Sequence, residues 1–529
     1  MKPEIAIALS GGGYRAAMFH LGTLSYLYHL QSEEGDTFLD MVNTISTISG
    51  GTITGLWYMM QYANDNISDE SFRELYHKLR KSNVVEKGLH NLLINKRKSL
   101  IKEMVEIYDK EFFNGTRFDV ILNKIDSGHI HHFSANGTDF SSGYAFRFQA
   151  SRRIKNIDQK FSRGFIGNNN NRIPWDMAKQ IKLSEMLAVS SCFPGGFEPM
   201  FFPSDFDFYN EQSDIDKNEI NDIPLMDGGI VDNQGIEPIL LANSQMQYDD
   251  ERAKGNKDFP CLDLIIVSDV TSPETETITK CSYNKLTQLS MRMADKYLCI
   301  GLLLGLIVCC MSACFGCSAL AGFFLCLEIL LAMLRICSCV IKQKVVRAIS
   351  NLPIQIDINQ LWKFPFSNIL SLLHNRFASL LQLSKAVFMK PIRQMRYKAI
   401  YESRMWKNRR ITNTIYELTE KYGSWKRKLQ KGNIPDWLAP SEEIIKNSEK
   451  ATRMGTTLWF TDKDRDNGLP EVLLACGQYN ICMNLLEYLQ KIKKDDTNTN
   501  ESHQQLMKFE KALMSDWEMF KKNPMWMAY

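Results

Sequence analysis

The N-terminal half of this 529-residue chain predicts an α/β domain with a largely parallel sheet. Two observations lead to this fold class. Short apolar runs alternate with longer runs whose apolar residues recur at helical spacing, as they do in successive β-α units. The first short run, Ile5–Leu9, is also apolar throughout, as is usual for a strand that is buried on both faces of a parallel sheet.

The predicted elements follow one another from the N-terminus. Strands are expected at Ile5–Leu9, Met41–Ile48, Phe133–Ala135, Tyr144–Gln149 and Leu262–Asp269. Helices are expected at Tyr14–Leu30, Thr52–Tyr62, Phe72–Leu79 and Ile101–Ile107. The first apolar run stops at Ser10-Gly11, so it is too short for the apolar core of a signal peptide. We therefore expect this run to begin the folded domain.

Composition and charge exclude several classes of protein. A hydrophobic fraction of 44% and a charged fraction of 23% are those of a globular chain. The net charge of +3 provides no general attraction for nucleic acid, so no nucleic-acid partner is expected. Of the 13 cysteines, eight lie in one apolar stretch, and the others lack metal-ligand spacing. We therefore expect no disulfide framework, no metal site and a reducing compartment.

The composition changes sharply after Lys296. Between Tyr297 and Leu334 the one charged residue is Glu328. A membrane-spanning helix needs about 20 apolar residues, so this stretch nearly fits two helices, with a turn at Ser312–Gly316. Basic residues flank both ends, and the positive-inside rule then places both ends in the cytoplasm. One long tilted span and a buried hairpin of a soluble protein are the alternatives.

Two further helical regions follow the apolar stretch. From Phe364 to Gln430 basic residues are interleaved with aromatic residues, which suits helices lying on anionic lipid headgroups and equally suits a solvated helical face. Near the C-terminus a helix at about Gln504–Lys521 is expected to pack on the rest of the fold. Its apolar face consists of Leu506, Phe509, Leu513, Trp517 and Phe520.

Three short segments carry the chemistry, and the first is the glycine loop Ser10–Arg15. It follows a predicted strand and opens a predicted helix. Its three glycines, Gly11, Gly12 and Gly13, allow a tight turn whose N–H groups point at one place, next to the positive end of a helix. Such a loop binds an anion, either a phosphate or the oxyanion of acyl transfer, and a structural turn is the alternative. It lacks the Lys-Ser/Thr ending of a Walker A loop.

The second segment is Thr47–Thr52, in which an apolar strand leads into Ser49 and then into a helix. Small neighbours on both sides permit the strained strand-to-helix turn that exposes a nucleophilic serine. Thr47 stands where the G-x-S-x-G pattern has its first glycine. A serine that caps the helix is the alternative. Ser46 is a rival hydroxyl, but it lies inside the predicted strand.

The third segment is Met226–Asn233, in which Asp227 precedes two glycines. Alone, this pattern is typical of a tight turn.

In this order the three segments resemble the patatin-like phospholipase family. That family combines a G-G-G-x-R/K loop, a G-x-S-x-G elbow and a D-G-G/A motif, which correspond here to Gly11–Arg15, Thr47–Gly51 and Asp227–Gly229. The resemblance covers about residues 4–271 and resumes near Ala451–Leu489. It implies a three-layer α/β/α sandwich around a mostly parallel central sheet.

The resemblance also implies a chemistry. Family members use a Ser-Asp dyad, so Ser49 is the expected nucleophile and Asp227 its base. The N–H groups of Gly11, Gly12 and Gly13 are the expected oxyanion hole. Arg15 is a candidate partner for a substrate phosphate, with a structural ion pair as the alternative. No cofactor and no metal are expected.

The function implied is that of a membrane-associated phospholipase A or lysophospholipase that cleaves fatty-acyl esters through an acyl-enzyme. A transacylase or neutral-lipid lipase with the same dyad is one alternative, and a catalytically silent lipid-binding scaffold is another. The expected partners are membrane phospholipid or lysophospholipid and the bilayer, and an oligomer is compatible with the sequence.

Four regions are expected along the chain. Residues 1–280 form the main part of the catalytic domain, 281–350 a membrane hairpin, 351–450 a basic helical region, and 451–529 the end of the catalytic fold with the C-terminal helix. The chain is expected to be integral to the membrane through about residues 297–341, with the catalytic domain facing the cytoplasm.

Overall fold

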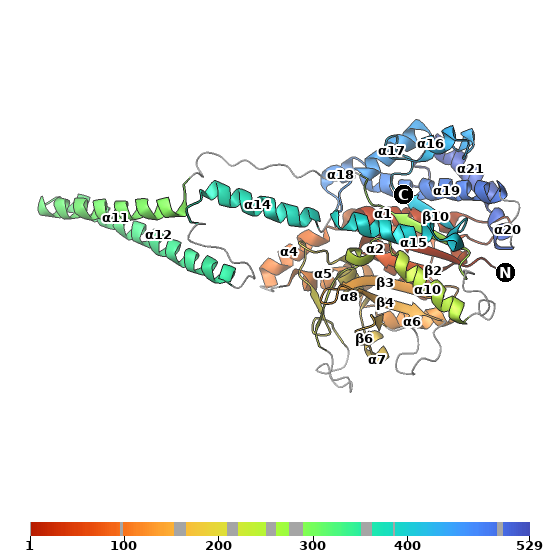
Figure 1. Ribbon diagram of the computed structural model, residues 1–529, viewed down its shortest axis with the longest axis horizontal. Helices are drawn as coiled ribbons and strands as arrows, with labels where there is room; N and C mark the ends of the chain where they lie inside the picture. The colour runs from red at the N-terminus through yellow and green to blue at the C-terminus, as the bar shows by residue number, and fades with distance from the viewer. Residues whose placement is uncertain are drawn as a thin grey trace. The chain divides into compact units, whose positions relative to one another are not determined.

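The structure, a computed structural model, describes residues 2–95, 99–152, 166–208, 221–249, 261–273, 289–350, 362–383, 387–494 and 501–529. These residues belong to two units (Figure 1). The first unit comprises Met1–Thr275 and Ser384–Tyr529, and the second comprises Glu276–Leu383. The second unit is therefore an insertion in the chain of the first.

Within the described residues, ten strands of the first unit form one mixed sheet. They are β1 (Ile5–Leu9), β2 (Val42–Ile48), β3 (His132–Asp139), β4 (Ala145–Ser151), β5 (Ile166–Gly167), β6 (Arg172–Ile173), β7 (Met200–Phe202), β8 (Ile223–Asp227), β9 (Leu264–Asp269) and β10 (Arg410–Thr414). The neighbours β10-β9-β1-β2-β3 run parallel. The pairs of β4 to β8 are antiparallel. The predicted α/β class is confirmed, with the parallel part confined to these five strands.

The strand β1 lies where the connections of the sheet change direction. From β1 the chain passes to β2 and β3 on one side, and it later returns to β9 on the other side of β1. In open α/β sheets, ligands bind at such a switch point, outside the carboxyl ends of the strands. The glycine loop leaves β1 at this end, so the topology alone marks it as a binding position.

Helices cover both faces of the sheet and complete three layers (Figure 1). On one face, alternate residues of β1 pack in a large apolar cluster with α1 (Gly13–His29), α2 (Gly50–Ala63) and α19 (Leu469–Lys494). On the other face, the remaining residues of β1 pack with α10 (Ile236–Asp249) and α15 (Met389–Tyr401). The expected α/β/α sandwich is confirmed.

The remaining helices of the first unit border these layers. They are α3 (Asp69–Lys81), α4 (Val84–Asn95), α5 (Leu100–Tyr108), α6 (Phe118–Ser127), α7 (Trp175–Ala178), α8 (Leu183–Ser191), α9 (Gly229–Asp232), α16 (Trp425–Gln430), α17 (Glu442–Thr452), α18 (Asp462–Asp466), α20 (Glu501–Met507) and α21 (Glu510–Lys522). The predicted C-terminal helix is divided into α20 and α21. Its predicted apolar face is confirmed, because all five residues named for it are buried.

The region expected at 351–450 is divided between the two units. Residues 384–450 belong to the first unit, and β10 within them pairs with β9. Basic side chains there make internal contacts: Arg409 pairs with Asp263 at 3.6 Å, and Arg410 donates to the Ile400 and Trp406 carbonyls. Residues 351–361 lie outside the described residues. This part of the chain is therefore only partly a solvated or lipid-facing surface.

The second unit contains, in its described residues, the helices α11 (Met291–Cys314), α12 (Ser318–Ser350) and α14 (Phe366–Gln382). Contacts near both ends of α11 show that α11 and α12 are antiparallel. Asp295 accepts a hydrogen bond from Ser338 at 2.8 Å, and Cys309 lies 3.5 Å from the Ala321 carbonyl oxygen. Between these two contacts, Gly305 lies against Glu328.

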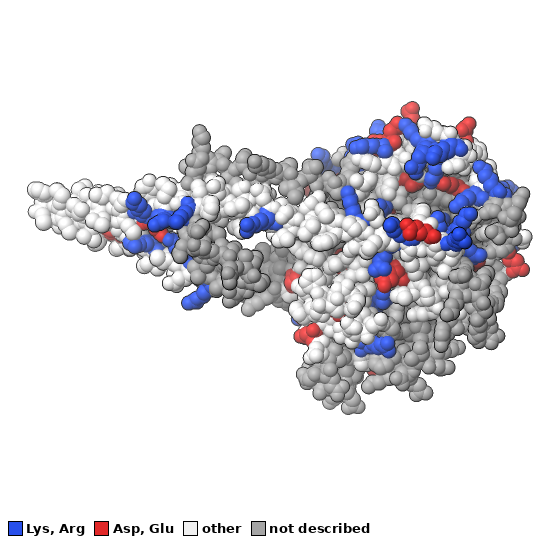
Figure 2. All heavy atoms as spheres, in the orientation of Figure 1, with Lys and Arg blue, Asp and Glu red and all other residues white. Residues whose placement is uncertain are grey.

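Both helices of this pair are long and apolar enough to cross a membrane. The stretches concerned are Arg292–Cys314, with 23 residues, and Ser318–Lys344, with 27 residues. The joining turn lies at residues 315–317, close to the predicted turn. On the face drawn in Figure 2, the end of the pair that holds this turn carries no Lys, Arg, Asp or Glu.

Gly22 of α1 faces Leu474 of α19 where the two helices meet. A Cβ on Gly22 would lie 1.9 Å from the Leu474 carbonyl oxygen. Replacing glycine by alanine inside a helix usually stabilises it by about 1 kcal/mol. For Gly22→Ala we expect instead a loss of about 1–3 kcal/mol, because the helices must move apart. Thermal unfolding of the purified chain measures this difference.

Gly88→Ala in α4 is the matched control. There the nearest atoms to a new Cβ are the ends of the Leu100 and Met104 side chains, at 3.2 and 3.3 Å. Flexible side-chain ends move at little cost, so this variant should unfold at or above the wild-type temperature. Equal stability of the two variants would contradict the close approach of α1 and α19.

Candidate active site

Ser49 occupies the turn between β2 and α2. Its φ of 49° and ψ of −119° lie outside the regions that residues other than glycine ordinarily adopt. Such strain costs of order 1–3 kcal/mol and persists where the surrounding structure enforces it. Within the described part of the chain, the Ser49 side chain makes no capping bond to α2. Ser49 stands at the N-cap position of α2 without a side-chain capping bond, so the geometry favours a nucleophile elbow over a capping serine.

The backbone of the glycine loop passes directly over this elbow. A Cβ on Gly50 would lie 2.0 Å from the Gly13 carbonyl oxygen, so only glycine fits there. Thr47 replaces the first glycine of the usual elbow pattern. The facing helix compensates, because a Cβ on Gly55 of α2 would lie 2.3 Å from Thr47 Cγ2. In the usual pattern a glycine on the strand leaves room for the facing helix. Here the glycine on the helix, Gly55, leaves room for the Thr47 side chain on the strand.

The glycine loop brings backbone N–H groups beside Ser49. A Cβ on Gly11 would lie 3.2 Å from Ser49 Cβ. Gly11 donates its own N–H to the Asn233 carbonyl oxygen at 3.0 Å. The N–H groups of Gly12 and Gly13 have no hydrogen-bond acceptor among the described residues. They lie at the N-terminus of α1, where the helix dipole favours a negative charge.

Asp227 is the last residue of β8, and it is 6% exposed. Its N–H donates to the Cys192 carbonyl at 2.9 Å, and its carbonyl accepts a hydrogen bond from Thr138 at 2.8 Å, so its backbone is held on both sides. Gly229 donates its N–H to Oδ1 at 2.7 Å. Burial raises the pKa of Asp227 to about 7, although hydrogen bonds from Gly229 and Ser49 lower it. A carboxyl with this pKa gains and loses a proton readily at neutral pH.

Ser190 of α8 supports the elbow from the side of β3. Its hydroxyl oxygen accepts the Ser49 N–H at 2.9 Å and lies 2.8 Å from the Thr52 hydroxyl. It donates to the Asn136 carbonyl at 2.7 Å. The segment Ala188–Pro199 has a familiar pattern in the sequence, but sequence reasoning gave Ser190 no role, because its contact with Ser49 joins residues 141 positions apart.

His20 and Asn233 hold the glycine loop, and neither was predicted to do so. Burial lowers the pKa of His20 to about 4, so its ring is neutral at pH 7. Nε2 lies 3.0 Å from the Ser10 carbonyl, which only accepts, so Nε2 carries the proton. Nδ1 then accepts from the Ser268 hydroxyl at 3.0 Å. A neutral histidine thus fixes the start of the loop, while the Asn233 carbonyl fixes Gly11.

Arg15 of α1 is directed into the protein. Its side chain is 5% exposed, and Nη1 donates to the Met454 carbonyl at 2.5 Å. This contact favours a structural role. The binding of a substrate phosphate by Arg15 stays a prediction.

The assembled groups suit acyl transfer. A strained serine, a buried carboxyl and two N–H groups with no acceptor in the described part of the chain meet at the carboxyl end of the parallel strands. Acyl transfer by a serine enzyme requires a nucleophile, a base and oxyanion donors, and these groups are of the kinds that fill those roles. Among the described residues, no group of three His, Cys, Asp or Glu side chains is arranged to hold a metal ion.

Comparison with known proteins identifies this region. Residues 7–240 match the family model described as patatin-like phospholipase, and the match includes the glycine loop, the elbow and Asp227. No curated protein matches the chain.

Two similar solved structures are of one human enzyme. Human GIVD cytosolic phospholipase A2 is 17% identical over 36% of this chain and 28% of its own, with a TM-score of 0.25. Its complex with a methyl gamma-linolenyl fluorophosphonate inhibitor and terbium chloride is 16% identical over 50% of this chain and 40% of its own, with a TM-score of 0.27. The chain thus spans less than half the length of either, and neither likeness bears on the fold.

Because Asp227 is buried, we expect its ionised carboxylate to lower the free energy of unfolding at neutral pH. Its folded pKa of about 7 exceeds the ordinary value of 3.8, so the folded state binds the proton more tightly. This contribution to stability falls as the pH rises from about 4 to about 7, by up to about 4 kcal/mol at 1.4 kcal/mol per pKa unit. Relative to the wild type, Asp227→Asn should gain stability between pH 4.5 and pH 8. Urea unfolding at both pH values measures the gain.

Asp269→Asn is a control for which we expect the opposite change in stability. Burial disfavours its charge too, but the Arg393 ion pair and hydrogen bonds from Thr271 hold the pKa of Asp269 below its ordinary value. Its removal should therefore destabilise the fold at pH 8. An Asp227→Asn variant that gains no stability relative to the wild type between pH 4.5 and pH 8 would show that burial of this carboxyl costs nothing.

Proposed function

We propose that this chain, whose residues 7–240 belong to the patatin-like phospholipase family, is a lipid acyl hydrolase that cleaves phospholipid or lysophospholipid esters through a Ser49–Asp227 dyad. One observation carries the proposal. Ser49 sits at a strained turn and hydrogen-bonds to a buried carboxyl whose pKa is about 7. Groups that are strained, buried and shifted toward neutral pKa are typical of catalytic sites.

In the proposed reaction Asp227 accepts the proton of the Ser49 hydroxyl while Oγ attacks the ester carbonyl carbon. The tetrahedral intermediate collapses to an acyl-enzyme, and the leaving alcohol takes the proton from Asp227. Water then attacks the acyl-enzyme and gives a proton to Asp227. The fatty acid leaves as the proton returns to Ser49 Oγ.

The oxyanion of each tetrahedral intermediate is assigned to the N–H groups of Gly12 and Gly13. Gly11 was expected to be a third donor, but its N–H is bonded to the Asn233 carbonyl. Two donors suffice for a large effect, because losing one such donor typically costs about 10²–10³ in rate.

For the second unit the proposal is that α11 and α12 cross a bilayer as a hairpin and keep the catalytic unit near its lipid substrate. In the two candidate spans, 6% and 0% of the most apolar window is buried, so among the described residues almost none of their apolar side chains is covered by protein. Glu328 lies against Gly305 of the facing helix, which suits a polar group at membrane depth. Basic residues at both ends of the pair favour cytoplasmic ends.

Ser49→Ala and Asp227→Asn test the dyad. We expect each to lower fatty-acid release from phospholipid vesicles by at least about 10³-fold, because a dyad loses most of its effect with either member. A fluorophosphonate probe should label the wild type and not Ser49→Ala. Release is followed by mass spectrometry, with triacylglycerol and an acyl acceptor as parallel substrates that reveal a lipase or a transacylase.

Ser46→Ala is the matched control, since Ser46 lies on β2, the strand that leads to Ser49, and carries the rival hydroxyl. It should keep the label and most of the activity. Equal fatty-acid release by the wild type and Ser49→Ala would remove Ser49 from the mechanism.

Leu306→Arg combined with Leu330→Arg tests the membrane hairpin. The two leucines are 60% and 54% exposed in α11 and α12. The wild type should stay in membranes through alkaline extraction. The double variant should be released, because each arginine costs about 2.5–3.5 kcal/mol at the centre of a span. Immunoblots of pellet and supernatant measure both.

The control places two arginines in α14, as Leu372→Arg and Leu373→Arg, outside both candidate spans. This variant should stay with the membrane. Extraction of the wild type into the supernatant would contradict an integral hairpin.

A further inference from the structure

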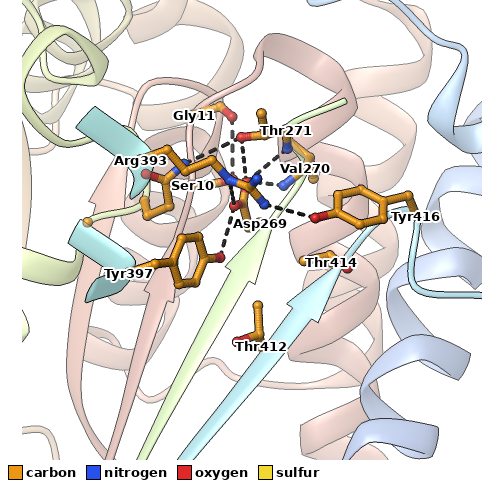
Figure 3. A network of polar contacts seen from close by, with 12 residues as sticks. Ser10, Gly11, Asp269, Val270, Thr271, Arg393, Tyr397, Thr412, Thr414 and Tyr416 are labelled. Atoms are coloured by element: carbon orange, nitrogen blue, oxygen red, sulfur yellow. Dashed lines mark hydrogen bonds and ion pairs between the residues drawn. The ribbon is translucent and has the colours of Figure 1, made fainter. Parts of the chain in front are cut away.

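A buried ion pair lies beside the glycine loop (Figure 3). Asp269 ends β9, the parallel neighbour of β1, and is fully buried. The next residue, Val270, donates its N–H to the Ser10 hydroxyl at 3.1 Å. Val270 Cγ2 would lie 2.6 Å from a Cβ on Gly12. The turn that Asp269 begins is therefore packed directly against the residue that carries a proposed oxyanion donor.

Four donors satisfy the Asp269 carboxylate. Thr271 donates its N–H and its hydroxyl to Oδ1, at 2.8 and 2.6 Å. Arg393 Nε and the Tyr397 hydroxyl donate to Oδ2, at 2.8 and 2.9 Å. Figure 3 shows the Arg393 side chain reaching past Asp269 to Tyr416, whose hydroxyl accepts Nη2 at 3.1 Å. One guanidinium from α15 thus joins the ends of β9 and β10.

A second arginine of α15 reaches the other support of the loop. Arg396 Nη2 donates to the Val231 carbonyl at 3.3 Å and pairs with Glu237 at 2.6 Å. Val231 lies in α9, and the residue after α9, Asn233, holds the Gly11 N–H. The loop is therefore supported on two sides by segments that α15 holds.

We propose that Arg393 is a positioning residue for the oxyanion donors of the glycine loop. By binding Asp269 it holds Val270 against Gly12, so that the Gly12 and Gly13 N–H groups stay directed at the reacting carbonyl oxygen. Arg393 touches neither Ser49 nor Asp227 and acts through Asp269. The inference rests on the proposed function, whose oxyanion hole it completes.

Stability alone explains this pair poorly. Desolvation of two buried charges offsets much of their attraction, and apolar residues of similar volume often give equal or greater stability. A planar guanidinium also fixes the relative orientation of the groups that it binds, because its N–H donors are rigidly placed and bind two acceptors at set angles. Here those acceptors are Asp269 and Tyr416, on two neighbouring strand ends.

The test is the turnover per active site of full-length Arg393→Gln. A fluorophosphonate, reacted to completion with Ser49, counts the folded sites, and fatty-acid release from phosphatidylcholine vesicles gives the rate. We expect kcat per labelled site to fall about 10- to 100-fold with KM changed less than about twofold, because a misplacement of about 1 Å can cost 10²-fold. Arg393→Lys, which keeps the charge, should recover part of the loss.

Lys398→Gln is the matched control, because Lys398 lies on the same helix with a side chain 67% exposed. It removes the same charge and should keep the wild-type kcat. Tyr397→Phe removes one donor to Asp269 and leaves the ion pair, so it should lower kcat per site by a smaller factor. If Arg393→Gln yields no labelled sites, the inference is tested with Tyr397→Phe and Arg393→Lys instead. A wild-type kcat per site in both of these variants then overturns it.

The outcomes separate this inference from the proposed function. Fewer labelled sites with wild-type kcat per site in Arg393→Gln would mean that the pair only stabilises the fold, which overturns the inference alone. A wild type that is neither labelled nor active overturns the proposed function, and the inference with it. A labelled, active wild type beside an Arg393→Gln with reduced kcat per site supports both.

Discussion

The glycine loop and the nucleophile elbow touch through their backbones, and the rest of the site depends on this contact. No side chain fits between Gly50 and the Gly13 carbonyl, so the two turns approach as closely as peptide groups allow. Such an approach needs β1 and β2 to be parallel neighbours, because their following loops then leave the sheet at one edge. Ser49 and the N–H groups of Gly12 and Gly13 are thus placed by the same pair of strands. Thr47 is compatible with this geometry only because Gly55 leaves room for it.

Two buried aspartates at strand ends of this sheet show how the surroundings decide the state of a carboxyl. Asp269 receives four hydrogen bonds, one of them from a cation, and burial does not prevent its charge. Asp227 is bound by Gly229 and Ser49 without a cation, and burial raises its pKa to about 7. A carboxylate whose oxygens have all their hydrogen-bond donors stays ionised and stabilises the fold. A carboxylate with few donors takes up a proton near neutral pH. The same strain and incomplete bonding that suit Asp227 and Ser49 to chemistry lower the stability of the fold.

The second unit interrupts the first between two strands that are neighbours in the sheet. The chain leaves after β9 and returns to form β10, which pairs with β9. The first helix after its return, α15, binds the last residue of β9 through Arg393. The segments before and after the insertion are therefore held together within the first unit, by the β9–β10 pairing and by the contact between Arg393 and Asp269. Because this junction lies against the glycine loop, the place where the chain re-enters the fold is also a support of the site.

The sequence by itself determined the α/β class, the glycine loop, Ser49, Asp227 and the two long apolar helices. Each of these features depends on a short run of neighbouring residues. The signal is the apolar spacing, the small residues at a turn or the length of an uncharged stretch. The tertiary structure alone decided which N–H groups remain for an oxyanion, that Ser190 and His20 hold the elbow and the loop, and that β10 lies in a region expected to be helical. It also decided the partner of Arg393, which lies 124 positions away. These are contacts between distant parts of the chain, and a basic side chain has the same appearance in a sequence whether it faces solvent or a buried carboxylate.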